Sequence, residues 1–331
     1  MATLKDVAKL ACVDVSTVSR ALNNTSYVHP DTKARIFEAV KTLSYHPNVL
    51  AKGLRKGKRH TLGVVIPFSQ LTIFADIVQS IETEARKLGY STLLCHTEDD
   101  PEIERHSLNR LRNGFVDGII IASTGQNGHL LRDIHASGIA VMQIIRKQEK
   151  SLSSVVADYK SCAYETVNYL VAKGCQNIGF INGNMHLAPY KGRYEGYEKA
   201  LNEHSLPKYC VIANGNCNSF DYGYQSAIDL LDQNPRLDAI MAAVDIQGMA
   251  AIRVLKEKGL NVPKDVKVVS LTGHSIGGLL ETSMTSQEIP AKDIGQMAVN
   301  MIVKDIDAPE NEKPSVQHLV FNAVMIERES S

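Results

Sequence analysis

The stretch Asp14-Val15-Ser16-Thr17-Val18-Ser19-Arg20-Ala21-Leu22 decides how the first sixty residues are organised. At helical spacing Val18, Ala21 and Leu22 fall on one apolar face. The opposite face carries Val15, Ser16, Ser19 and Arg20. Asp14 stands where an N-cap carboxylate accepts from the free N–H groups of the first helical turn. A short helix with small hydrogen-bonding side chains and an arginine on its exposed face has the composition that reads base edges in a major groove.

The neighbouring segments predict two more helices. Leu4, Val7, Ala8 and Ala11 follow the i, i+3, i+4, i+7 pattern of a short amphipathic helix. Only Cys12-Val13-Asp14 separates it from the helix at Val15, and so tight a turn predicts a helix-turn-helix. A third helix begins at Pro30. The residues expected to face inward from it are Ile36, Phe37, Val40 and Leu43.

Composition and charge divide the chain into unlike parts. With 331 residues, 44% of them apolar and 22% charged, the chain suits two or three globular domains. Residues 1–60 hold 11 lysines and arginines against 4 acidic residues, whereas the remainder holds 25 against 32. A basic head on an acidic body indicates an anionic polymer as the partner of the head alone.

The sequence also predicts a compartment and a lack of bound metal. No N-terminal apolar run resembles a signal peptide, and no stretch approaches the ~20 apolar residues of a membrane span, so we expect a cytoplasmic protein without a membrane partner. Six scattered cysteines form no C-x-x-C pair and no zinc-ligand spacing with histidine. Neither a P-loop nor a G-x-G-x-x-G motif occurs, and we expect no cofactor.

From residue 61 onward, apolar runs alternate with helical patterns. The runs read as buried strands at 62–67, 91–95, 118–122, 155–157, 178–181, 240–244 and 266–271. This alternation is typical of parallel βαβ sheets in an α/β fold. Over about 270 residues two doubly wound lobes are more plausible than one sheet, with a ligand cleft between them. Ligand-binding residues should lie at the carboxyl ends of the strands.

The head resembles the LacI/GalR family of bacterial transcription regulators. The resemblance lies in Leu4-Lys-Asp-Val-Ala-Lys-Leu-Ala11, in Val15-Ser-Thr-Val-Ser-Arg-Ala-Leu-Asn-Asn24 and in Tyr45-His-Pro-Asn-Val-Leu-Ala-Lys-Gly-Leu54. It implies that the helix from Val15 enters the major groove and that Val15, Ser16, Ser19 and Arg20 contact bases. Cys12 departs from the glycine usual in the turn, at a backbone cost if its φ is positive. The residues that map onto positions touching or flanking phosphates are Leu4, Thr17, Asn23, Tyr27 and Thr32.

Residues 47–60 resemble the hinge of that family. Pro47 suits the first turn of a helix that is too short to be stable alone in water. The resemblance implies that it forms only on DNA, beside its dimer mate, with Asn48 and Ala51 at the DNA and Leu54 wedged between base pairs of the minor groove. A plain linker would explain the basic run at 55–59 but not Pro47 or Leu54.

The resemblance implies a body like the periplasmic sugar-binding proteins, with three chain crossings near 159, 288 and 319. Lobe 1 would then hold 61–158 and 289–318, and lobe 2 would hold 159–288 and 319–331. A cleft with a guanidinium and carboxylates suits a polyhydroxylated effector, a sugar or sugar phosphate. The positions that carry over to the effector site are Phe74, Arg146, Asp158, Arg193, Asn218, Phe220, Asp245 and Thr272.

Several of these positions depart from the family pattern. The usual Asn-Pro-Phe-Phe is Leu71-Thr-Ile-Phe74, the usual aspartate before Arg146 is Ile145, the capping aromatic is Asn218, and an acidic residue is Thr272. An altered, phosphorylated or absent ligand therefore stays open. Some members are instead controlled by a phosphorylated carrier protein acting as co-repressor. Asn300 stands where an arginine would meet that phosphate, which argues mildly against this alternative.

Two rival functions remain. Gly273-His274-Ser275-Ile276-Gly277 after a strand has the form of the G-x-S-x-G elbow of serine hydrolases. Its downstream acid and base candidates are Asp293, Asp305, Asp307 and His318, but only 56 residues follow Ser275, too few for that fold. A pure binding or transport protein would lack the head. We therefore predict a non-enzymatic, homodimeric repressor of a palindromic DNA operator, modulated by a small molecule.

Overall fold

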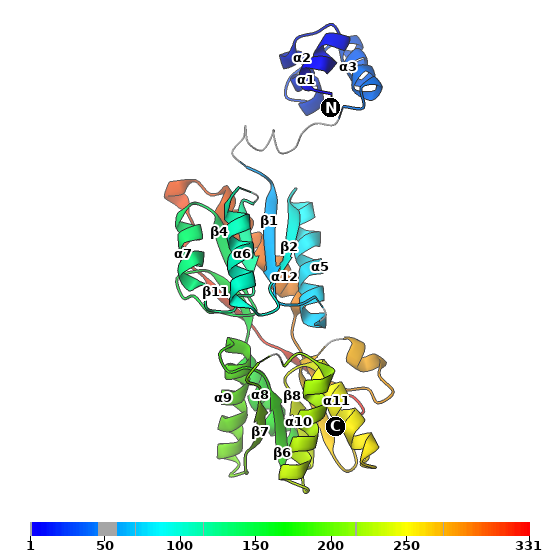
Figure 1. Ribbon diagram of the computed structural model, residues 1–331, viewed down its shortest axis with the longest axis vertical. Coiled ribbons are helices and arrows are strands. Elements are labelled where there is room, and N and C mark those ends of the chain that lie inside the picture. Colours follow the sequence, from blue (N-terminus) through cyan, green and yellow to red (C-terminus); the bar gives the residue numbers. More distant parts are fainter. Residues whose placement is uncertain (1, 46–57, 70, 115, 216, 274) are drawn as a thin grey trace. The chain divides into compact units, whose positions relative to one another are not determined.

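The computed structural model describes residues 2–45, 58–69, 71–114, 116–215, 217–273 and 275–331 (Figure 1). The chain divides into two compact units, Met1–Arg59 and His60–Ser331, which are called the head and the body below. The predicted hinge helix from Pro47 falls outside the described residues.

The head consists of three helices around a small apolar core. These helices are α1 (Leu4–Leu10), α2 (Val15–Asn23) and α3 (Pro30–Thr42). A capping box joins Thr3 and Asp6 at the start of α1, and Pro30 occupies the first turn of α3. Val7, Val18 and Ile36 each have no exposed surface and meet at the centre. The helix-turn-helix prediction is thereby confirmed.

Two details of the head differ from the simplest expectation. Phe37 is 47% exposed, so its predicted inward orientation was wrong. Ile36 and Ala39 fill the core from α3 instead, and Val40 and Leu43 pack against them from its edge. Cys12 has a φ of 53°, so a residue with a side chain occupies the left-handed conformation that glycine adopts at lower cost, and the condition for the predicted backbone cost is met.

Lobe 1 of the body is a parallel sheet between two pairs of helices. Helices α5 and α12 pack on one face, while α6 and α7 pack on the other. The strand order β11-β5-β4-β3-β1-β2 leaves β11 and β2 at the edges. The elements are β1 (Thr61–Ile66), α5 (Thr72–Lys87), β2 (Ser91–His96), α6 (Pro101–Arg112), β3 (Gly118–Ile121), α7 (Gly128–Ala136), β4 (Ala140–Ile144), β5 (Ser154–Ala157), α12 (Ala291–Asp307) and β11 (His318–Phe321).

Lobe 2 repeats this architecture. Helices α8 and α9 cover one face of its sheet, and α10 and α11 cover the other. The strand order is β12-β10-β9-β8-β6-β7, and β12 alone in this sheet runs antiparallel, against β10. The elements are α8 (Tyr159–Ala172), β6 (Ile178–Asn182), α9 (Ala188–Glu203), β7 (Tyr209–Ile212), α10 (Phe220–Gln233), β8 (Ala239–Ala242), α11 (Asp245–Glu257), β9 (Lys267–Gly273), β10 (Thr285–Glu288) and β12 (Val324–Ile326), with short 3₁₀ turns η1 (Ser275–Leu279) and η2 (Glu310–Glu312) in the body.

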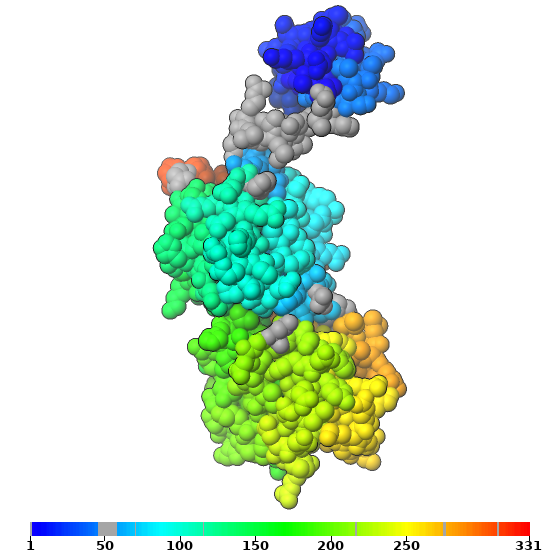
Figure 2. All heavy atoms as spheres, viewed as in Figure 1, coloured from blue at the N-terminus to red at the C-terminus, as the bar shows by residue number. Residues whose placement is uncertain are grey.

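The chain passes between the lobes at three places. The first two lie between β5 and α8 and between β10 and α12. The third lies after Phe321, because all four residues of β11 pair with β5 in the sheet of lobe 1. The predicted boundary at 318/319 therefore cuts through β11 and is displaced by a few residues. Figure 2 shows the lobes in contact on its visible face, with lobe 1 in cyan to green and lobe 2 in green to orange.

Candidate functional site

The exposed face of α2 carries the four residues that sequence predicts to read bases. Val15 is 39% exposed, and Ser16 and Arg20 are exposed, while Ser19 is half-buried. Val18 and Ala21 are buried on the other side in the core of the head. Asp14 stands at the N-cap, although its side chain makes no capping hydrogen bond. The helix thus presents two serines, a valine and an arginine on one face, while its opposite face packs into the core of the head.

The other residues of the head that were predicted to contact DNA differ in how far they are exposed. Tyr27 is 84% exposed, whereas Leu4 packs against the head core. Asn23 donates from Nδ2 to the carbonyl oxygen of Ser19 at 2.8 Å, which fixes the end of α2. Thr17 and Thr32 are partly buried. The residues Asn48, Ala51 and Leu54 lie outside the described part of the chain.

In the body, four of the predicted effector residues line one small cavity between the lobes. The cavity has a volume of about 30 Å³. Apolar side chains contribute much of its wall, among them Leu71, Ile73 and Ile145. The predicted residues in its lining are Phe74, Arg146, Arg193 and Thr272.

Lobe 2 contributes one cationic side chain, Arg193, to the lining of this cavity. Its side chain projects from α9, is 3% exposed, and donates from Nη2 to Thr272 Oγ1 at 2.5 Å. The guanidinium carbon lies 4.8 Å from the ring centre of Tyr159 and 5.7 Å from that of Tyr190. Among the described residues, the hydrogen bonds of Arg193 go to the Thr272 hydroxyl and the carbonyl oxygen of Leu271, and neither of these partners is a carboxylate.

The two tyrosines beside Arg193 were not predicted from the sequence. Burial raises the pKa of Tyr159 to about 12 and that of Tyr190 well above its ordinary value, so both hydroxyls stay protonated at neutral pH. Tyr190 donates to Asn218 Oδ1 at 2.8 Å. Gly183 makes room for this ring, because a Cβ there would approach it to 2.5 Å. No sequence pattern indicated that either tyrosine would lie beside Arg193.

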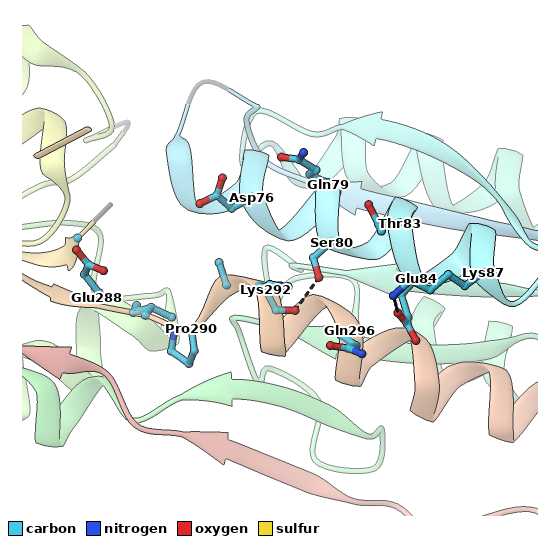
Figure 3. A pocket seen from close by; sticks show the side chains of 13 residues that line it. Asp76, Gln79, Ser80, Thr83, Glu84, Lys87, Glu288, Pro290, Lys292 and Gln296 are labelled. Atoms are coloured by element: carbon cyan, nitrogen blue, oxygen red, sulfur yellow. Dashed lines mark hydrogen bonds and ion pairs between the residues drawn. The ribbon is translucent and has the colours of Figure 1, made fainter. Parts of the chain in front are cut away.

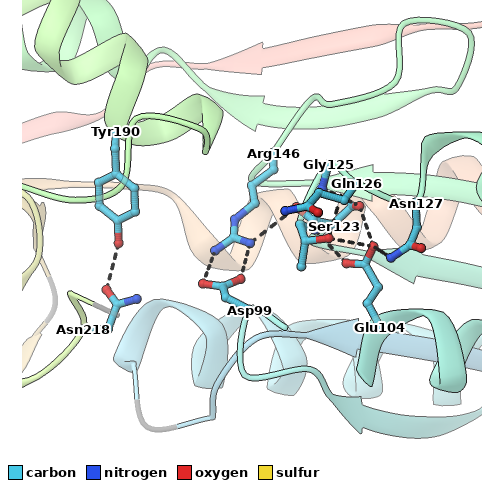
Figure 4. A network of polar contacts seen from close by, with 10 residues as sticks. Asp99, Glu104, Ser123, Gly125, Gln126, Asn127, Arg146, Tyr190 and Asn218 are labelled. Atoms are coloured by element: carbon cyan, nitrogen blue, oxygen red, sulfur yellow. Dashed lines mark hydrogen bonds and ion pairs between the residues drawn. The ribbon is translucent and has the colours of Figure 1, made fainter. Parts of the chain in front are cut away.

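Arg146 has a full set of partners within lobe 1 (Figure 4). It binds both carboxylate oxygens of Asp99, at 2.5 and 3.0 Å, and also contacts the carbonyl oxygen of Ser123. Burial disfavours the charged guanidinium, but the hydrogen bonds and charge of Asp99 outweigh this effect and hold the pKa of Arg146 above its usual value. Its charge is therefore neutralised within the protein, and the sequence had not indicated Asp99 as the partner.

The other predicted effector residues lie in adjoining cavities or outside them. Asn218, Phe220 and Asp245 line a cavity of about 420 Å³, together with Thr272. Asn218 also lines a third cavity of about 200 Å³ that contains Asp99. Asp158 lines none of these three cavities: it caps α8 and accepts from Ser161 N at 2.9 Å.

A further cavity of about 530 Å³ lies at the second lobe crossing (Figure 3). Residues of α5 and of the start of α12 form most of its wall, and Ser80 Oγ donates to the carbonyl oxygen of Lys292 at 2.6 Å. Most of its lining residues have polar side chains, and none of them is a predicted effector residue.

The described residues on either side of position 274 do not form the strand-to-helix turn of a hydrolase elbow. Strand β9 ends at Gly273 and a 3₁₀ turn follows, whereas the elbow requires a strand-to-helix turn. The base candidate His318 belongs to the sheet of lobe 1, where its Nδ1 lies 3.0 Å from Ser154 Oγ. The acid candidates Asp293, Asp305 and Asp307 all lie on α12, which packs on lobe 1 as well.

Two general features of the described residues bear on function. None of their His, Cys, Asp and Glu side chains form a group of three or more that could hold a metal ion. No helix within the described ranges has the length and apolar character needed to cross a bilayer.

Comparison with known proteins gives matches for both units. Residues 3–48 match the family model of bacterial regulatory proteins of the lacI family, and residues 59–323 match periplasmic binding proteins and the sugar binding domain of the LacI family. The chain is 34% identical to the HTH-type transcriptional regulator RegA of Clostridium acetobutylicum, with 99% of each chain covered.

Solved structures show the same architecture. A transcriptional regulator CelR–cellobiose complex is 26% identical with a TM-score of 0.74, and all of both chains is covered. The lac repressor dimer bound to operator and the anti-inducer ONPF is 22% identical with a TM-score of 0.88, covering 99% of this chain and 98% of that one.

Proposed function

The chain belongs to the LacI family of bacterial regulatory proteins, and from this premise we propose that it represses transcription by binding a palindromic operator as a homodimer under the control of a small molecule. Family membership makes it a DNA-binding transcription regulator with a periplasmic-binding-protein-like body. The operator symmetry, the dimer and the small-molecule control are the parts we propose.

The exposed face of α2 is the observation that carries this proposal. Its serines and arginine offer donors and acceptors to base edges, while Val15 offers an apolar contact to a thymine methyl group. Two such helices related by a two-fold axis read two half-sites, so the operator mirrors the symmetry of the protein. The excess of basic residues in 1–60 supplies phosphate contacts that position the head without specifying sequence.

The test is selection of binding sites for the purified protein from a random duplex pool at physiological salt. We expect an enriched palindrome. Arg20→Ala should then reduce affinity for that site by about 10- to 100-fold and relax the preference at one base of each half-site. The control is Arg35→Ala on the exposed side of α3, which should retain the preference. Binding that is salt-sensitive and unselective for the wild-type protein would refute the proposal.

The edge of lobe 1 supports a homodimer. Strand β2 is an edge strand of the sheet, and its residues Leu93 and Leu94 are 42% and 40% exposed. An exposed apolar edge strand invites pairing or aggregation unless something covers it. We propose that a second copy of the chain covers it.

The proposed control acts through the cleft of the body. Three chain crossings connect the lobes, so a ligand held by both lobes would alter the angle between them. In a dimer this change would alter the separation of the two hinge segments at 47–60. The helix that the resemblance predicts from Pro47 would have little stability of its own, so we expect a modest change in separation to unfold it.

A further inference from the structure

We infer that the cleft of the body selects a carboxylate with a single apolar substituent, in place of the sugar or sugar phosphate that the family resemblance predicts. The inference deepens the proposed small-molecule control and rests on it. It follows from three properties of the cleft: the space at Arg193, the unused hydrogen-bonding capacity of that arginine, and the apolar wall of the adjoining cavity.

The space at Arg193 limits the size of the polar group that can reach it. The cavity holds about 30 Å³, which is room for one or two water molecules. A carboxylate fits beside Arg193, whereas a pyranose or furanose ring would have to lie in the adjoining cavity of about 420 Å³. Phe74 and Tyr159, both buried, close it on the side of lobe 1 and at the first crossing.

Arg193 retains a donor for such a group. Its Nε is buried and has no hydrogen-bond partner, although Nη2 is bound to Thr272 and to the carbonyl oxygen of Leu271. Arg146 has already been neutralised by Asp99. A carboxylate would supply both an acceptor for Nε and the counter-charge of a buried guanidinium.

The adjoining cavity of about 420 Å³ offers room for the rest of the ligand. It shares Leu71, Ile73, Val244 and Thr272 with the space at Arg193. Phe220, Ile246 and Met249 extend the apolar wall. The polar side chains of this cavity, Thr72, Asn218, Ser219, Asp245 and Thr272, occupy only part of its wall. Against the apolar part, a sugar hydroxyl without a partner would lower affinity about tenfold or more, whereas a phenyl or branched alkyl group gains from burial there.

Electrostatics also fixes the direction in which the ligand lies. Asp245 lines the larger cavity and is only 5% exposed. Its carboxylate disfavours a second carboxylate at that end. The acid group therefore points to Arg193 and the apolar group toward Phe220.

The test is isothermal titration calorimetry of the full-length protein with 3-phenylpropionate and 4-methylpentanoate as probes. We expect at least one of them to bind at least about tenfold more tightly than 3-phenylpropan-1-ol or 4-methylpentan-1-ol, and more tightly than glucose, ribose or glucose 6-phosphate. Failure of both acids to bind at millimolar concentration, or tighter binding by a sugar, would overturn the inference.

Two variants assign the contacts. Arg193→Gln should weaken binding of the acid by about 10- to 100-fold and leave that of the matching alcohol unchanged. The control is Arg253→Gln, whose exposed side chain pairs with Glu257 on α11 outside the cleft. Because Phe220 is 40% exposed, Phe220→Ala should leave the fold intact and weaken the apolar acid several-fold. Equal losses for acid and alcohol in Arg193→Gln would exclude its role as the carboxylate partner.

Operator affinity, measured separately, distinguishes failure of this inference from failure of the proposed function. A sugar that binds and changes operator affinity would uphold small-molecule control and overturn the ligand class. An acid that binds as expected without changing operator affinity would uphold the ligand class and remove its regulatory role.

Discussion

At the scale of single residues, Glu104 places a carboxylate in lobe 1 with no exposed surface. It accepts hydrogen bonds from Ser123 Oγ, from both the backbone N–H and the hydroxyl of Thr124, and from Asn127 Nδ2, at 2.7 to 3.1 Å (Figure 4). These contacts fix the loop after β3 onto α6. That loop also carries the Ser123 carbonyl oxygen that Arg146 contacts.

Glu104→Gln should lower the free energy of unfolding by about 1–3 kcal/mol, because the amide NH₂ would meet donors where an oxygen now accepts. Chemical denaturation followed by circular dichroism measures this change. Glu102→Gln is the matched control on α6: its side chain is 69% exposed and pairs with Arg105, so we expect a change below about 0.5 kcal/mol. A loss of the same size in both variants would show that the buried network contributes nothing specific.

The sequence indicated which cleft positions to consider but not their partners. Phe74, Arg146 and Arg193 do line one cavity, as expected from their places after strands or on a helix facing the cleft. Asp99 lies 47 residues from Arg146 in sequence, and only the folded sheet brings the two together. The apolar residues Leu71 and Ile145 were visible in the sequence as departures from the family pattern, yet only the structure shows that both line the cavity at Arg193.

At the scale of elements, apolar runs predicted most of the buried strands but missed β4, although all five of its residues are buried. Helical periodicity predicted that Ile36 and Phe37 both face the core of the head. In the structure only Ile36 is buried, and the adjacent Phe37 is exposed. The boundary at 318/319, placed from the family resemblance, divided the chain too early near β11, whose partly exposed residues at a sheet edge give only a weak periodic signal. Pairing with β5 decides the lobe of this strand, and pairing depends on the tertiary fold.

Leu54→Ala tests the predicted hinge element, which lies outside the described residues. If the leucine wedges between base pairs, its removal should weaken binding to the selected operator about tenfold or more and change binding to a scrambled duplex less than about twofold. Electrophoretic mobility shift at one fixed salt concentration measures both, since backbone contacts depend strongly on salt. Equal losses on the two duplexes would exclude the wedge.

At the scale of the whole molecule, operator binding and self-association should fail together. Leu93→Asp places a charge on the exposed edge of β2, where a second copy would bury it without a partner. We expect sedimentation equilibrium to give a monomer and operator affinity to fall toward non-specific binding. Ile103→Asp on α6, 39% exposed at wild type, is the control and should remain dimeric. A Leu93→Asp protein that stays dimeric would place the interface elsewhere.

The late position of β11 and β12 along the chain has a consequence for synthesis on the ribosome. Both lobes receive an edge strand from residues 318–326, whereas the head has its own core within the first 45 residues. At about 5–20 residues per second, the head emerges roughly 15–55 s before these strands. During that interval the nascent chain carries a folded head, including α2, while the sheets of both lobes still lack an edge strand. Translation that stops early would therefore release basic heads that bind DNA without the control that we propose for the completed body.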